Sequence, residues 1–259
     1  LSALKPNFKV APITAFIVLV PLSGTEPPLS FAIDRILEIS IGSLIGVAVS
    51  LLVLPSRAHQ QMSDQAARII DLNADLLGLI IDNLLAGEGR PALQATHTAI
   101  RGALKKLESA AEEAARERRS HLTELPDPEP MVRTLYRVRH DLVMVGRSTV
   151  RSFPVVILPS LQAPLIDLRT ALLEFLRGGA VALRERKEPP PLAPTETALK
   201  VYGAAMDGLW SNETIRALAA EEAGRIFALR FALEQLGQDL RDLANRISEL
   251  AKPGVKPAT

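Results

Sequence analysis

The chain has 259 residues, no cysteine and a nearly balanced charge, with 30 Lys and Arg against 29 Asp and Glu. The missing cysteines exclude disulfides, thiolate metal sites and a cysteine nucleophile, and the near-zero net charge gives no indication of nucleic-acid binding. Apolar residues are concentrated in the first 55 positions, and a charged, Leu- and Ala-rich pattern follows. Because the sequence begins at Leu1 rather than Met, we expect a piece of a longer protein or a processed mature chain.

Two apolar runs in the N-terminal region predict membrane-spanning helices at about 8–24 and 31–54. The first run is marginal in length. The second, at 1.5 Å per residue, reaches about 36 Å and exceeds a hydrocarbon core of about 30 Å. Basic residues flank both outer ends and are absent from the loop between the runs, so the positive-inside tendency places both ends in the cytoplasm. The alternatives are a signal peptide in the first run, a buried helix of a soluble bundle in the second, or a hairpin that only anchors a soluble domain.

Two sets of residues in the second run indicate possible roles for that helix in anion contact and in helix packing. Arg35 and Glu38 lie one turn apart and can pair, or Arg35 can meet an anionic substrate, since arginine binds a carboxylate through two parallel hydrogen bonds. The competing interpretation places them at the outer interface, where they set the depth of the helix. Gly42, Gly46 and Ser50 recur four apart, which favours close packing of two helix backbones.

Beyond Pro55, apolar residues at helical spacing predict a helical domain over 57–251, followed by a disordered tail at 252–259. Its last helix carries a three–four repeat that serves either as one wall of a bundle or as an intermolecular coiled coil. The repeat consists of Ile226, Leu229, Leu233, Leu236, Leu240, Leu243, Ile247 and Leu250.

A basic face is expected on the helix that contains Met131 to Val145. It could contact an anion or lipid headgroups, or be neutralised by acids such as Glu112, Glu113, Glu117 and Asp141. Its members are Arg133, Arg137, His140, Arg147 and Arg151.

No catalytic or cofactor signature accompanies these helices. The four histidines are scattered, with none at a metal-ligand spacing, and no phosphate-binding loop or nucleophile–base pair is present. We therefore predict a non-enzyme without metal or cofactor.

The segment "AIDRILEISIGSLIGVAVSLLVLPSRA", at 32–58, resembles the last transmembrane helix of the fusaric acid resistance / aromatic acid exporter (FUSC-like) family through Arg35, Glu38, Gly42, Gly46 and Pro55. "RVRHDLVMVGR", at 137–147, is similar to a segment of the helical domain that follows in short members. The resemblance implies six transmembrane helices followed by a cytoplasmic helical domain, often in a dimer. Only two of the six expected spans lie in this chain, so the remaining ones would belong to a missing part.

These observations together predict an all-α protein: two transmembrane helices at 1–56, part of a larger helical membrane domain, followed by a cytoplasmic helical bundle. The function that the resemblance implies is efflux of organic anions, such as aromatic carboxylic acids, across the inner membrane. The expected partners are the lipid bilayer, an organic anion substrate, the remaining transmembrane helices and a second copy of the chain. The alternative is a membrane-anchored helical scaffold or dimerisation module without transport activity.

Overall fold

The computed structural model describes residues 28–53, 57–86, 91–119, 126–211 and 218–251, and these residues form helices and no strand. The all-α prediction is therefore confirmed for the described part of the chain. The chain divides into two compact units, 1–55 and 56–259. The predicted first span and the predicted disordered tail lie outside the described residues.

The first unit contributes one described helix, α2, Pro28–Val53. Its large apolar side chains from Ile33 to Val47 are 41–76% exposed and occur on all sides of the helix. Among the described residues, no helix combines the length and the apolar character that a membrane crossing requires. The predicted span at 31–54 is thus confirmed as a helix but not as a membrane span.

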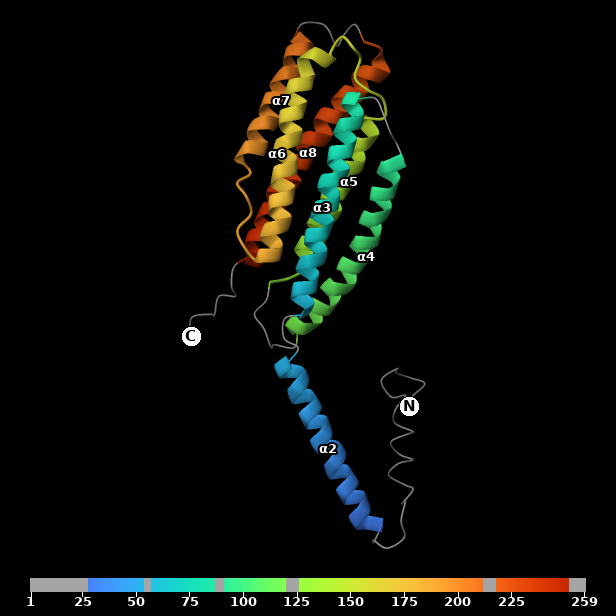
Figure 1. Ribbon diagram of the computed structural model, residues 1–259, viewed down its shortest axis with the longest axis vertical. Helices are drawn as coiled ribbons and strands as arrows, with labels where there is room; N and C mark the ends of the chain where they lie inside the picture. The colour runs from blue at the N-terminus through green and yellow to red at the C-terminus, as the bar shows by residue number, and fades with distance from the viewer. Residues whose placement is uncertain (1–27, 54–56, 87–90, 120–125, 212–217, 252–259) are drawn as a thin grey trace. The chain divides into compact units, whose positions relative to one another are not determined.

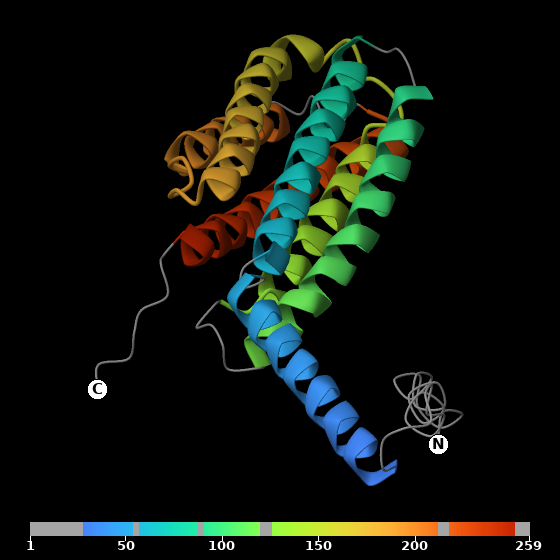
Figure 2. The ribbon, with the colours of Figure 1, turned by 60° about the horizontal axis from the view of Figure 1, so that its bottom comes forward.

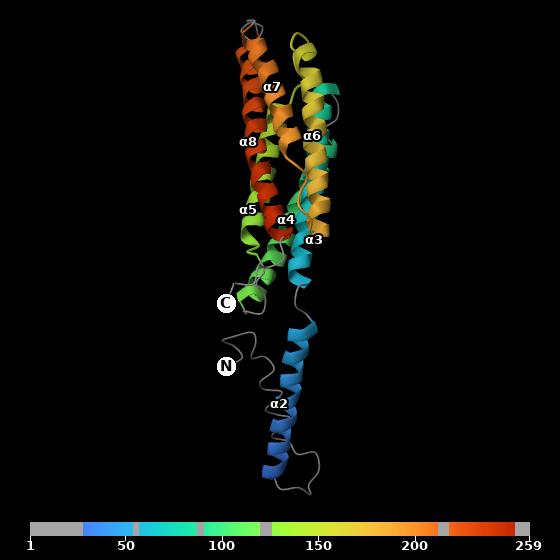
Figure 3. The same cartoon turned by 90° about the vertical axis from the view of Figure 1, so that its left-hand side faces the viewer.

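The described residues of the second unit form a bundle of six helices, and successive helices alternate in direction (Figures 1 and 3). Their bounds are α3 Arg57–Ala86, α4 Pro91–Arg119, α5 Glu129–Ser148, α6 Leu158–Glu185, α7 Ala193–Ser211 and α8 Ala220–Ala251. Helix α3 packs against α4, α5 and α6, and α8 packs against α5, α6 and α7. Figure 2 shows α3 and α5 within this packing, with α4 on one side and α6 on the other.

Buried apolar residues at three- and four-residue spacing explain why these segments are helices that pack together. The predicted α8 repeat is buried from Ile226 to Ile247 within the chain's own core, and Leu250 packs partly buried at its edge. Because these side chains face α5, α6 and α7 of the same chain, the bundle interpretation is confirmed over the intermolecular coiled coil.

Three ion pairs between α3 and α6 fix the antiparallel register of these helices. Asp82 accepts a hydrogen bond from Arg169 at 2.7 Å, Asp75 lies 3.5 Å from Arg177, and Asp71 pairs with Arg184. Residue numbers rise along α3 as they fall along α6, as opposite directions require. Each pair is partly exposed and contributes little stability, so the pairs select the alignment while the core supplies the energy.

The segment between α6 and α7 folds back onto α6 at a glycine. Helix α6 is capped by Arg186, whose φ of 53° places it in the left-handed region. A Cβ on Gly178 would lie 2.9 Å from Cγ of Pro190, a rigid ring atom. Only glycine therefore lets the proline-rich linker approach this closely, and the buried Thr195 then donates to the carbonyl of Ala171 at 3.2 Å.

Candidate functional site

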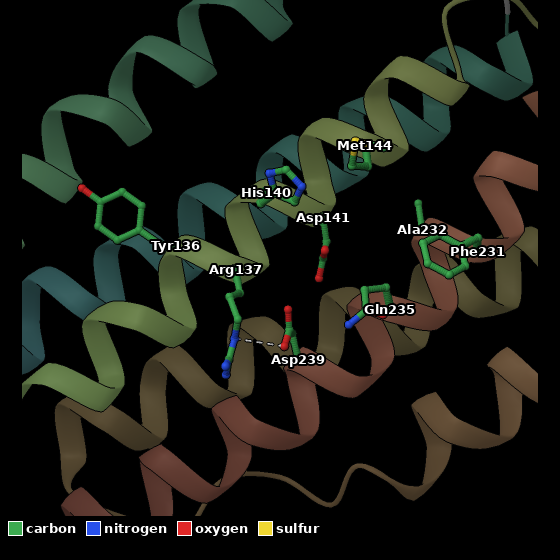
Figure 4. Close-up of a pocket in the computed structure, with 9 residues that line it drawn as sticks. All are labelled: Tyr136, Arg137, His140, Asp141, Met144, Phe231, Ala232, Gln235 and Asp239. Atoms are coloured by element: carbon green, nitrogen blue, oxygen red, sulfur yellow. Dashed lines mark ion pairs between the residues drawn. The ribbon is translucent and has the colours of Figure 1, made fainter.

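A pocket of about 480 Å³ lies between α5 and α8, and two buried aspartates line it. Its size falls within the ordinary range of small-molecule sites. The lining residues are Tyr136, Arg137, His140, Asp141, Met144, Phe231, Ala232, Gln235 and Asp239. Figure 4 shows Asp141 of α5 and Asp239 of α8 pointing toward one another across it.

Both carboxyl groups are removed from water by the helix packing. Asp141 is 4% exposed and Asp239 8% exposed. Burial, a hydrogen bond to Asp239 and repulsion by its charge raise the pKa of Asp141 to about 7, against an opposing effect of Arg137. Asp141 therefore stays partly protonated near neutral pH and, when protonated, can donate to Asp239. Its Oδ2 atom has no hydrogen-bond partner among the described residues.

Arg137 is held on the far side of this acid pair. Its Nε lies 3.2 Å from Oδ1 of Asp239, and its Nη2 donates to Asp242. Thr134 donates to the same Asp242 at 2.6 Å. These hydrogen bonds, together with Arg246 and Arg137, outweigh desolvation and lower the pKa of Asp242. The network keeps Asp242, which lies outside the pocket lining, ionised, whereas the pKa of Asp141 inside the pocket is raised to about 7.

Replacing Thr134 with valine should destabilise the protein by about 1–2 kcal/mol, because the isosteric side chain keeps the packing but leaves the Asp242 carboxylate without one donor. Thr134 is 1% exposed, so water cannot easily replace the hydroxyl. The matched control is Thr170→Val, since the Thr170 hydroxyl is exposed and donates only to the carbonyl of Ile166 in its own helix. Chemical denaturation measures both, and equal losses would contradict the proposed role of the buried hydrogen bond.

The predicted basic face is only partly realised. Arg133, Arg137, His140 and Arg147 lie on α5, but the helix ends at Ser148, so Arg151 lies beyond it. That part of the prediction was wrong, because Thr149 caps the helix and directs its backbone N–H to the carbonyl of Val145.

The acids that neutralise the basic face also differ from those expected. Arg133 pairs with Glu129, 3.4 Å away, and Arg151 with Glu221, 3.6 Å away. Arg137 pairs with two α8 acids, as described above, whereas the Glu112 of the expected set pairs with Arg116 of its own helix. Glu129 lies one turn before Arg133 on α5 itself, whereas the other partners come from α8, which a pattern confined to one helix cannot identify.

In the first unit, Arg35 and Glu38 form the ion pair that their one-turn spacing predicts. A Cβ on Gly42 or Gly46 would meet no described atom within 4 Å. Ser50 lies in the same helix, but its side chain is outside those described. The substrate and packing roles of these residues stay predictions.

Comparison with known proteins places these features in a family. The family model described as the fusaric acid resistance protein family matches residues 7–253, nearly the whole chain. The chain belongs to the fusaric acid resistance protein family. This membership confirms the resemblance seen in the sequence and indicates a membrane protein with a general transport or efflux function rather than an enzyme. No curated protein and no solved structure matches the chain.

Sequence reasoning missed the acid pair of the α5–α8 pocket. Asp141 lies three residues after Val138 and four before Val145, on the buried stripe of its helix. Asp239 lies three residues after Leu236 and four before Leu243, on the buried stripe of α8. The sequence signal that could have revealed the pair is that each of the two helices carries an aspartate among the apolar residues of its buried stripe. The family membership itself does not assign a role to this pair.

Proposed function

We propose that the protein is part of an efflux system that moves organic anions, such as aromatic carboxylic acids of the fusaric acid type, across the inner membrane. The observation that carries the proposal is the family match over residues 7–253. In this proposal the segments at about 8–24 and 31–54 cross the membrane, and the helical unit lies in the cytoplasm. The remaining transmembrane helices and a second copy of the chain complete the assembly.

The surface of α2 supports a membrane location for the first unit. A helix that is apolar on all sides is normally buried, either in a large protein core or in lipid. Exposed residues such as Ile36, Leu44 and Ile45 therefore call for a surrounding apolar medium or neighbouring helices. The small residues Gly42 and Gly46 offer one place for close helix contact.

We further propose that Arg35, with Glu38, lies near the path of the anion. Charged residues in a membrane helix are costly and usually face a helix-bundle interior or an aqueous path. The Arg35–Glu38 pair neutralises the arginine at rest, and an incoming carboxylate can replace Glu38 as its partner. We propose anion or lipid-headgroup contacts for the basic side chains Arg133, Arg137, Arg147 and Arg151; for Arg137, such a contact requires its two α8 pairs to open.

Replacing Arg35 with glutamine should abolish resistance to fusaric acid in cells that produce the full-length protein, because the anion loses its bidentate partner. Growth at increasing fusaric acid concentration measures resistance, and immunoblotting of membrane fractions verifies unchanged abundance. The matched control is Arg101→Gln, which removes an exposed arginine of α4 and should leave resistance unchanged. Full resistance of the Arg35 variant would overturn the site assignment.

A membrane-anchored scaffold is the second candidate, and it is favoured by one observation: the described helices of the second unit bury an apolar core made of their own residues. A scaffold needs no transport of its own. Accumulation of radiolabelled fusaric acid in producing cells distinguishes the two functions. Efflux lowers accumulation relative to cells without the protein, whereas a scaffold leaves it unchanged.

A further inference from the structure

We propose that the pocket between α5 and α8 binds an organic monocation, consisting of a primary ammonium group on an aromatic or branched apolar body. The ammonium would lie against Asp141 and Asp239, and the apolar body against Phe231 and Met144. This site belongs to the helical unit, and it stands independently of which anion, if any, the protein exports.

The charge of the pocket selects a cation over an anion. The one arginine in the lining, Arg137, is already shared between Asp239 and Asp242. The Tyr136 hydroxyl donates outward to Glu108 of α4 at 2.6 Å. An anion would therefore meet the His140 ring and the Gln235 amide as the remaining donors of the lining while facing two carboxyl groups, whereas a cation meets both carboxyl groups directly.

A buried acceptor without a partner points to the position of the ammonium group. Asp141 is 4% exposed, and its Oδ2 accepts no hydrogen bond from the described residues. Unsatisfied buried carboxylate oxygens are costly, and an ammonium group brings three donors. One ammonium can thus satisfy Oδ2 of Asp141 and bridge to Asp239, which faces it.

The bound cation would replace a proton. At neutral pH, Asp141 is held partly protonated beside Asp239. When the ammonium arrives, the Asp141 O–H bond breaks, its proton leaves to solvent, and the resulting carboxylate pairs with the ammonium. No other bond changes, so the step balances as one cation bound for each proton released from the protonated form.

The apolar walls of the pocket explain why the cation should carry an apolar body. Phe231 is 66% exposed on α8, a large fraction for a phenylalanine, and Met144 of α5 lies partly buried beside the pocket. A ligand ring packed on Phe231 would remove this apolar surface from water. The face of an aromatic ring also attracts a nearby cation.

Isothermal titration calorimetry of the purified full chain with two probes of similar shape and opposite charge tests the proposal. We expect 2-phenylethylammonium to bind once per chain at pH 7.5, and phenylacetate to bind at least tenfold more weakly. Asp141→Asn and Phe231→Ala should each weaken the amine at least tenfold, with circular dichroism verifying that the variants fold. Asp82→Asn, which removes an exposed α3 acid, should leave binding unchanged. Equal binding of the two probes, or an Asp141 variant that binds normally, would overturn the proposal.

Proton release gives a second readout that simple surface adsorption would not show. Asp239 and Arg137 are the charged groups that act on Asp141, and His140 and Gln235 complete the polar lining. Because the amine competes with the Asp141 proton, its affinity should be about a hundredfold higher at pH 8 than at pH 5. An affinity that does not change between these pH values would contradict the assignment of Asp141.

Discussion

Replacing Leu240 with alanine should lower the free energy of unfolding of the helical unit by about 2–5 kcal/mol, the usual cost of removing a large core side chain. Leu240 is fully buried and lies in the α8 repeat, among side chains that face α5, α6 and α7. The cost combines lost apolar burial with a cavity that the surrounding helices cannot fill completely, because rigid helices on three sides limit collapse.

Urea denaturation of the purified chain, followed by far-ultraviolet circular dichroism, measures this loss. Ile166→Ala is the matched control, because Ile166 is 42% exposed on α6 and its truncation opens no internal cavity. We expect the control to cost well under half as much as Leu240→Ala. If the two variants unfolded at the same urea concentration, α8 would not be an integral wall of the bundle, and its repeat would be available for contacts between chains.

The α8 repeat shows why the helical class could be predicted from the sequence. Its three–four spacing places every member on one side of the helix, and that geometry is set locally by 3.6 residues per turn. Which helices cover that side depends on residues far away in the chain. The sequence therefore left a bundle wall and an intermolecular coiled coil as alternatives, and the contacts with α5, α6 and α7 distinguish them.

The acid pair shows the limit of the same reasoning. Asp141 was interpreted as one of several acids available to a basic face, because only its position on α5 was considered. Its character comes from Asp239, 98 positions later in the chain, and from burial by the packing of two helices. A raised pKa is a property of the assembled pair, so no single-helix pattern contains it.

In the first unit, local pairing was predictable and function was not. A spacing of three residues on a helix brings Arg35 and Glu38 together regardless of what surrounds them. Whether the helix crosses a membrane, and whether an anion approaches Arg35, depends on neighbours outside the described residues. The family match gives the general transport function, and the experiment on Arg35 tests the specific role.

Replacing Asp141 with asparagine should stabilise the protein at pH 8 by about 1–2 kcal/mol and by less than half as much at pH 5. The pKa of this carboxyl rises from about 3.9 in an unfolded chain to about 7 in the fold. Between these values the folded chain holds a proton that the unfolded chain has released. The stability that this proton contributes is fully present below about pH 4 and is lost as the pH rises through about 7. Asparagine keeps a hydrogen-bond donor for Asp239 at every pH, so the variant does not lose this stability as the pH rises.

Other groups titrate in the same range, so the comparison must be between variant and unmodified protein at each pH. Burial, Arg139 and Arg101 lower the pKa of His97. Since the folded chain then binds the His97 proton less tightly than the unfolded chain does, this group adds stability as the pH rises through about 6.5, opposite in sign to Asp141. Because His97 is present in both proteins, its contribution cancels in their difference. Urea denaturation at pH 5, 6.5 and 8 should therefore show a difference that grows steadily with pH. A difference that stays constant would mean that Asp141 is ionised throughout, and that the two carboxyl groups do not share a proton.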